Sequence, residues 1–163
     1  MRKVLERHEV PAEVKWKLED IYASDELFER DLAAARAGLA GVQELRGSIT
    51  SSQNLLKVLK RRDELGMLVD RLTAYAFMRR DEDNGNSKYQ AYADQALSVD
   101  VMARSAFAFL EPEILSLEST TVWEWVEAEP ELAVYKHYLH NVLRMQAHTL
   151  PAEQEQLLAE AGE

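Results

Sequence analysis

The chain has 163 residues, of which 47% are apolar and 29% are charged, a balance typical of one globular domain or one lobe of a larger protein. It contains no Cys, which excludes disulfide bonds, thiolate zinc sites and a cysteine nucleophile. Its 29 acidic residues outnumber its 19 basic ones, and the net charge of −10 disfavours binding to the phosphates of nucleic acids.

The sequence shows neither a secretory signal nor a membrane span. Residues 1–9 lack the apolar run of a signal peptide, and no apolar stretch reaches the length needed to cross a bilayer. We therefore expect a soluble protein of the cytoplasm that binds no membrane and no nucleic acid.

Residues 1–23 are expected to form an irregular lead-in, and residues 24–163 one helical lobe. Three apolar residues are candidate anchors of the lead-in onto the lobe: Trp16, Leu18 and Ile21. Ser24 has the chemistry of an N-cap, and the acidic residues after it favour the positively polarised first turn of a helix. Apolar residues then recur every three or four positions, which predicts a helix ending near Leu45: Phe28, Leu32, Ala35, Leu39 and Val42.

The next apolar stripe predicts a long helix that contains Gly66 and is capped by Ser51 or Ser52. The stripe consists of Leu55, Leu59, Leu65, Val69, Leu72 and Ala76. A polar turn over residues 81–87 follows it, with Asn86 or Ser87 as the cap of the next helix. A third helix is predicted over residues 89–110. We expect it to lie at the centre of the fold, because its apolar residues cover most of its faces: Tyr92, Ala96, Val99, Val101, Met102, Phe107 and Phe109.

The remaining residues predict short helices. Pro112 begins a helical turn, and Thr121 with Glu124 has the spacing of a capping box. Pro130 fits the first position of a further helix, and a last helix is expected over residues 151–162. No segment alternates polar and apolar residues as a strand does, so the sequence predicts an all-α fold, a bundle of antiparallel helices.

His8 and Glu9 begin like the zinc-peptidase motif H-E-x-x-H, but Ala12 stands in the place of the second His. Pro11 would also break the helix that brings two such His residues together. The sequence therefore predicts no metal site at these residues.

His137, His140 and His148 could share one side of a helix. Arg144 lies between them and disfavours a bound cation, and zinc sites usually have a tighter ligand pattern. A polar helix face explains these residues, with a metal site at His137 and His140 as the weaker alternative.

The acidic loop of residues 81–86 does not follow the EF-hand pattern, because Asn86 and Tyr92 stand where a calcium loop has Gly and Glu. A turn between helices explains the loop without calcium. One basic cluster is followed directly by Asp63 and Glu64, which favours a solvated helix face over a phosphate site. This cluster consists of Lys57, Lys60, Arg61 and Arg62.

Trp123 and Trp125 are two residues apart and point in different directions if they lie on one helix. Either both are buried at a bend, or one of them packs against a partner outside this chain. The residues thus predict no catalytic group and no metal ligand, and substrate-binding residues are unknown at this stage.

Nine segments, taken in order, resemble the N-terminal region of the oligoendopeptidase F family, zinc peptidases of the thimet-oligopeptidase type. The segments are residues 9–11, 15–22, 24–26, 72–75, 81–90, 109–115, 135–144, 148–150 and 155–159. The chain departs from the family at Lys17, where Asp is frequent, and at Pro151, where Ser is common. The resemblance covers nearly the whole chain.

The resemblance implies the N-terminal lobe of a cytoplasmic zinc metalloendopeptidase that hydrolyses short peptides but not folded proteins. In this family two His residues of H-E-x-x-H and a later Glu hold the zinc, within a C-terminal catalytic domain that this chain lacks. The lobe is expected to form part of the wall that limits substrate access. Its expected partners are that catalytic domain and oligopeptides, and the isolated chain should be inactive.

Two alternatives stay open: a stand-alone helical protein-interaction module without catalysis, and a small metal-binding protein that uses His137 and His140. Residues 157–162 are expected to form a helix cut near its end, which favours the lobe. A lobe separated from its partner should expose an apolar face and should self-associate. We expect this face at Trp123, Trp125, Leu150, Leu157 and Leu158.

Overall fold

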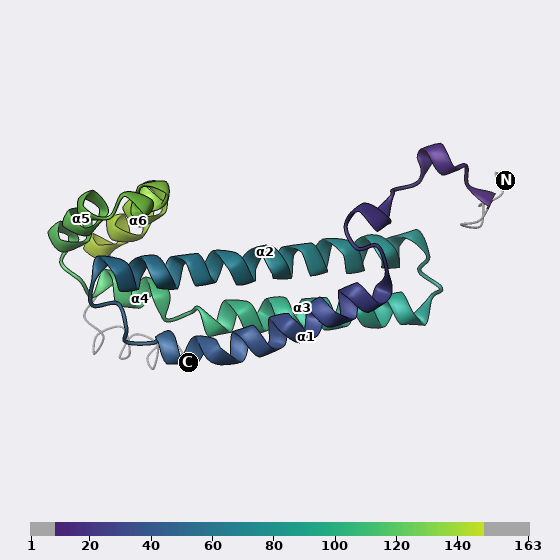
Figure 1. Cartoon of the computed structure of the whole chain (residues 1–163), viewed down its shortest axis with the longest axis horizontal. Coiled ribbons are helices and arrows are strands. Elements are labelled where there is room, and N and C mark those ends of the chain that lie inside the picture. The colour runs from purple at the N-terminus through teal and green to yellow at the C-terminus, as the bar shows by residue number, and fades with distance from the viewer. Residues whose placement is uncertain (1–8, 149–163) are drawn as a thin grey trace. The chain divides into compact units, whose positions relative to one another are not determined.

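The structure, a computed structural model, describes residues 9–148 and shows helices without any β-strand in that range (Figure 1). The α-helices are α1 (Asp25–Ala40), α2 (Ser52–Glu82), α3 (Ser87–Ala106), α4 (Leu110–Leu115), α5 (Ser119–Ala128) and α6 (Lys136–Arg144). Short 3-10 helices cover Ala12–Val14, Leu18–Asp20, Gly41–Leu45, Pro130–Tyr135 and Met145–His148. The all-α prediction is confirmed. Within the described range, none of these helices has the length and apolar character of a membrane span.

The chain divides into two compact units. The first contains residues 1–44 and 60–107, and the second contains residues 45–59 and 108–163. Helix α2 therefore contributes its first turns to the second unit and its remainder to the first. The division of the chain into a lead-in over residues 1–23 and a lobe over residues 24–163 stays a prediction.

In the first unit, α1 lies antiparallel to α2 and parallel to α3. The Tyr75 hydroxyl of α2 donates to Asp25 in the first turn of α1. Further along α1, the backbone carbonyl of Gly38 accepts from Arg61 of α2. The residue numbers of the α2 partners therefore fall as those of α1 rise, so the two helices are antiparallel. The residue numbers of the α3 partners rise together with those of α1, because Asp25 contacts Lys88 and Glu29 contacts Tyr92. The three helices thus alternate in direction along the chain, as expected for an antiparallel bundle.

The core of the first unit is aromatic at the start of α1. Phe28 is fully buried, and its ring stacks on Tyr92 at a centroid distance of 4.5 Å. Tyr75 and Tyr22 also contact Phe28, at 5.4 and 5.8 Å. Along the rest of the unit the predicted stripes are buried at Leu32, Ala35, Leu39, Leu65, Val69, Leu72, Ala76, Ala96 and Val99.

Two of the predicted helix caps are confirmed by hydrogen bonds. The Ser51 hydroxyl accepts from the backbone N–H of Asn54, and the Asn86 side chain accepts from the backbone N–H of Lys88. Ser24 occupies the N-cap position of α1, but its side chain caps no backbone group. Its hydroxyl instead bonds the Glu26 carboxylate, which lowers the pKa of Glu26.

The second unit is built on buried apolar residues from its short helices. Ile114, Val122, Leu132 and Leu139 are each fully buried. The Gln146 side chain donates to the backbone carbonyls of Leu115, the last residue of α4, and of Leu117, at 3.0 and 2.9 Å. The prediction that Pro130 begins a helix is confirmed, although the first six residues form a 3-10 helix before α6 begins.

The predicted capping box at Thr121 and Glu124 is wrong. Helix α5 begins three residues earlier, because Glu118 is the N-cap: its backbone is extended and its carbonyl accepts from the backbone N–H of Val122. Thr121 therefore lies inside the helix. The prediction that Trp16 anchors the lead-in is also wrong. Leu18 is buried as an anchor should be, but the Trp16 side chain is 55% exposed.

The prediction that the third helix lies at the centre of the fold is wrong for one side of that helix, which is exposed. Tyr92, Ala96 and Val99 are buried, but Val101 and Met102 are exposed, and the helix ends at Ala106 rather than at residue 110. The helix is apolar around most of its circumference, yet α1 and α2 cover only part of it. Within residues 9–148, an apolar surface of α3 is consequently left uncovered.

Gly47 is the one described glycine with a positive φ, 74°. Its backbone N–H donates to the Glu113 carboxylate at 2.6 Å, which joins the loop before α2 to α4. We expect Gly47→Ala to lower the free energy of unfolding by about 1 kcal/mol, because a Cβ disfavours this backbone conformation. A Cβ would contact no other atom there, so backbone strain is the only cost.

Gly66→Ala is the matched control, measured with Gly47→Ala by urea unfolding. Gly66 lies within α2, and a Cβ there also meets open space. Alanine favours the helix, so we expect this variant to gain about 0.5–1 kcal/mol. Equal effects of the two substitutions would contradict the left-handed conformation at Gly47.

Candidate functional site

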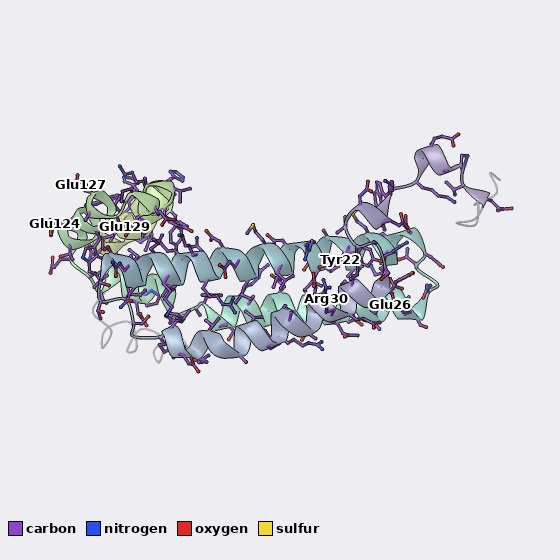
Figure 2. The ribbon with its side chains drawn as sticks, viewed as in Figure 1. Tyr22, Glu26, Arg30, Glu124, Glu127 and Glu129 are labelled. Carbon is purple, nitrogen blue, oxygen red and sulfur yellow. The ribbon has the colours of Figure 1, made fainter. Side chains whose placement is uncertain are left out.

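Charged and phenolic side chains of the first unit form the Tyr22 cluster, defined as Tyr22, Asp31 and Arg71. The Tyr22 hydroxyl donates to the Asp31 carboxylate at 3.2 Å and accepts from Arg71 Nε at 3.0 Å. Arg71 also donates directly to Asp31. Arg30 Nη2 also donates to Asp31, at 3.0 Å. Figure 2 labels Tyr22 and Arg30. The cluster fastens the end of the lead-in to α1 and α2.

The Tyr22 cluster keeps its carboxyl ionised and its phenol protonated. Burial of Asp31 would raise its pKa, but hydrogen bonds from Arg30 and Tyr22 and the charges of Arg30 and Arg71 outweigh this effect and lower it. Burial raises the pKa of the Tyr22 phenol above its ordinary value. Arg71 also lies over the Tyr22 ring, 4.9 Å from its centroid.

A second group, the Asp25 cluster, is defined as Asp25, Tyr75, Arg79 and Lys88. Asp25 accepts from the Tyr75 hydroxyl at 2.9 Å and from Lys88 Nζ at 2.8 Å. Arg79 Nε donates to the Tyr75 hydroxyl at 3.1 Å, and its guanidinium reaches Glu19 of the lead-in at 3.3 Å. These contacts join the first turns of α1 and α3 to the last turns of α2.

The Asp25 cluster is suited to fixing positions rather than to moving protons. Burial would raise the pKa of Asp25, but hydrogen bonds from Lys88 and Tyr75 and the charges of Lys88 and Arg79 lower it overall. Burial raises the pKa of Tyr75. General acid–base catalysis at neutral pH needs a pKa near 7, and both groups are shifted away from neutrality.

Neither cluster is predicted from the sequence, although position 31 carries a signal. Asp31 lies three residues after Phe28 and one before Leu32, so it falls within the apolar stripe of α1. A carboxylate at such a position needs a cationic or hydrogen-bonding partner when the helix packs. The partners Tyr22 and Arg71 are nine and 40 residues away in the sequence, and only the fold brings them together.

Two of the His residues considered for metal binding lie on α6. His137 and His140 are exposed on α6, and the His137 ring is hydrogen-bonded to the side chain of Asn141 at 3.0 Å. His8 and the side chain of His148 lie outside the described residues. Within residues 9–148, no three His, Asp or Glu side chains are close enough to hold a metal ion.

The two charged segments behave as expected from the sequence. The acidic loop is a turn between α2 and α3, in which the backbone N–H of Gly85 donates to Asp83 at 3.1 Å. In the basic cluster, Arg61 pairs with Glu64 at 3.3 Å and Arg62 pairs with Asp63 at 2.9 Å. Local acidic partners thus neutralise part of the cluster, as predicted.

Trp123 and Trp125 on α5 are both half-buried, so the alternative that both are buried is wrong. Packing of one of them against a partner outside this chain stays a prediction. Glu124 and Glu127 are exposed on the same helix, and Glu129 follows its last residue (Figure 2). Leu150, Leu157 and Leu158, which were expected to complete an apolar face with the two Trp residues, lie outside the described residues.

Comparison with known proteins shows the family of this chain. The family described as Oligopeptidase F matches residues 113–163. Oligopeptidase PepF of Bacillus subtilis is 36% identical over 159 residues, which are 97% of this chain and 24% of the relative. A plasmid-encoded oligoendopeptidase F of Lactococcus lactis is 31% identical over 96% of this chain and 26% of its own length. The chain belongs to the oligoendopeptidase F family. It matches that family's N-terminal region and spans about a quarter of the length of these relatives.

Solved structures agree with this assignment. The crystal structure of oligoendopeptidase-F from Enterococcus faecium is 32% identical, with a TM-score of 0.70 over 86% of this chain and 28% of that one. A structure from Chlamydophila abortus has a TM-score of 0.84 over 98% of this chain at 22% identity, and this likeness concerns the fold alone. The resemblance identified from nine sequence segments is confirmed.

Proposed function

We propose that this oligoendopeptidase F chain is the N-terminal lobe of a zinc-dependent, cytoplasmic peptidase that hydrolyses short peptides. The observation that carries the proposal is the 36% identity to an oligopeptidase along 97% of the chain. The absence of Cys is in keeping with a reducing compartment.

The described residues do not fit the zinc, because no sufficient set of His, Asp and Glu side chains gathers within residues 9–148. On the family resemblance, we propose that the zinc ligands and the water-activating Glu lie in the three quarters of the relatives' length that this chain does not span. We assign no catalytic step to this chain. Zinc at such a site would polarise the peptide carbonyl and activate water.

The role proposed for this lobe is steric. The Tyr22 and Asp25 clusters fix the lead-in, α1, α2 and α3 relative to one another through bonds between charged groups. A rigid helical wall beside a catalytic cleft would admit short, extended peptides and would exclude folded proteins. The oligopeptidase names of the relatives support this role.

The test uses quenched fluorescent peptides of increasing length, with the full-length enzyme and with residues 1–163 alone. We expect the full-length enzyme to cleave short peptides, to lose this activity with a zinc chelator, and to leave a folded protein intact. The isolated chain should show no turnover. Chelator-resistant cleavage by the full-length enzyme would contradict the proposal. Zinc-dependent cleavage by the isolated chain that His140→Ala abolishes would favour the metal-binding alternative.

A further inference from the structure

Helix α3 presents an apolar surface that no described residue covers. Leu97, Val101 and Met102 are 49%, 58% and 41% exposed. Residues 97 and 101 are four apart and so lie on one side of the helix, and Met102 follows next to them. We call these three residues the α3 face. Isolated exposed apolar residues are normal, but three neighbouring ones on one helix form a patch.

The α3 face borders two shallow depressions of the first unit. One lies between α1 and α3 and is lined by Leu39, Ala40, Val101, Met102 and Ala106. The other continues along α3 past Leu97 and Ser98 as far as Asp94. The small side chains of Ala40, Ser98 and Ala106 leave room for the side chains of a partner between the larger residues. This shape is suited to a packed helix or an extended segment.

The charges at the two ends of the α3 face define the chemistry of its partner. At one end, Asp100 and Arg104 pair with each other at 2.9 Å, so they present no net charge. At the other end, Asp94 is exposed and the described residues give it no ion pair. A fitting partner is therefore apolar along most of its length, with a Lys or Arg side chain placed against Asp94.

We infer that the α3 face binds an apolar segment of the same polypeptide, within the three quarters of the enzyme that this chain does not span. This inference rests on the proposed function. The relatives are about four times as long as the matching region, so an intramolecular partner is available at high effective concentration. Covering the face removes apolar surface from water, at about 25 cal/mol per Å².

A second copy of the chain is disfavoured as the occupant by charge. Two copies would each carry a net charge of −10 and would bring the two Asp94 carboxylates to one interface. Like charges so placed oppose association. A second copy also loses translational and rotational entropy when it binds. A covalently connected segment loses much less, because it is already held near the face.

Cysteine labelling tests the inference, because this region contains no Cys of its own. Val101→Cys places a thiol on the α3 face, and Met67→Cys is the control, since Met67 is an exposed residue of α2 outside the face. Each variant is made in the full-length enzyme and in residues 1–163. Maleimide labelling of the two sites is followed by peptide mass spectrometry.

We expect both thiols to react at similar rates in residues 1–163. In the full-length enzyme, the thiol at position 101 should react at least about tenfold more slowly than the thiol at position 67. Met102→Lys should remove most of this protection, whereas Met67→Lys should leave it unchanged. Peptide hydrolysis by the unsubstituted enzyme is measured separately. A failure of the proposed function can therefore be distinguished from a failure of this inference.

Four outcomes would overturn the inference. Equal labelling rates at positions 101 and 67 in the full-length enzyme would show that the face is open. Protection that depends on protein concentration would assign the face to a second copy, and concentration-independent protection within residues 1–163 would assign it to this chain itself. Protection that appears only after a peptide is added would assign it to the substrate.

Discussion

Phe28→Ala is expected to lower the free energy of unfolding by about 3–5 kcal/mol, the range for removal of a buried aromatic side chain. Phe28 is fully buried and contacts the rings of Tyr22, Tyr75 and Tyr92. Each such aromatic pair contributes beyond its buried area. Because the three Tyr hydroxyls are held by hydrogen bonds, the rings cannot close freely over the cavity, which places the cost towards the upper end of the range.

Urea unfolding followed by circular dichroism measures this cost, with the dependence on urea concentration compared between variants. Val134→Ala is the control, because Val134 is an exposed residue in the second unit. We expect it to change the free energy of unfolding by less than about 0.5 kcal/mol. A Phe28→Ala midpoint equal to that of the unsubstituted chain would show that this aromatic core is misplaced.

Asp31→Asn is the second variant with a large expected effect, a loss of about 1–2 kcal/mol at pH 7. The substitution preserves the size of the side chain but removes the charge that Tyr22, Arg30 and Arg71 contact. Hydrogen bonds to charged groups contribute about 1.5–3 kcal/mol. Arg30 and Arg71 are each at least half exposed and can be rehydrated, so the net loss is smaller.

The effect of Asp31→Asn should also depend on pH. The pKa of Asp31 in the folded chain lies below its ordinary value of 3.8. Its ionised form therefore contributes stability above pH 3.8, and this contribution is lost as the pH falls through the lower pKa of the folded state. The difference between the unsubstituted chain and Asp31→Asn should hence shrink below about pH 4. Asp70→Asn, at an exposed position of α2, is the control.

The stability of both variants is measured from pH 7 down to pH 3. A loss for Asp31→Asn that stays constant over this range would show that the carboxylate does not carry the effect. A loss for Asp70→Asn as large as that for Asp31→Asn would show that the effect follows from the change in net charge rather than from the Tyr22 cluster.

Local sequence signals predicted the helices well, because each signal acts within a few residues. Ser51 and Asn86 are caps whose bonds reach only two or three residues onward, and the stripe from Phe28 to Leu39 is buried as its spacing indicates. The capping box at Thr121 failed because the extended backbone of Glu118 begins the helix earlier.

The predictions that failed or were missed depend on distant contacts. The exposure of Val101 and Met102 depends on how far α1 and α2 extend around α3, which no pattern within α3 reveals. Asp31 was overlooked because its partner Arg71 is 40 residues away. The anchor prediction at Trp16 fails for the same reason, since Leu18 and Tyr22 are the buried residues in the described part of the lead-in.

The parallel pairing of α1 with α3 has a consequence during synthesis on the ribosome. Asp25 and Lys88, which join the first turns of these helices, are separated by 63 positions. At about 5–20 residues per second, the partner of Asp25 is synthesised roughly 3–13 s after Asp25 itself. During this interval the apolar stripe of α1 lacks the ring of Tyr92 that later covers Phe28. The nascent chain is therefore most exposed to chaperones and to aggregation before α3 leaves the exit tunnel.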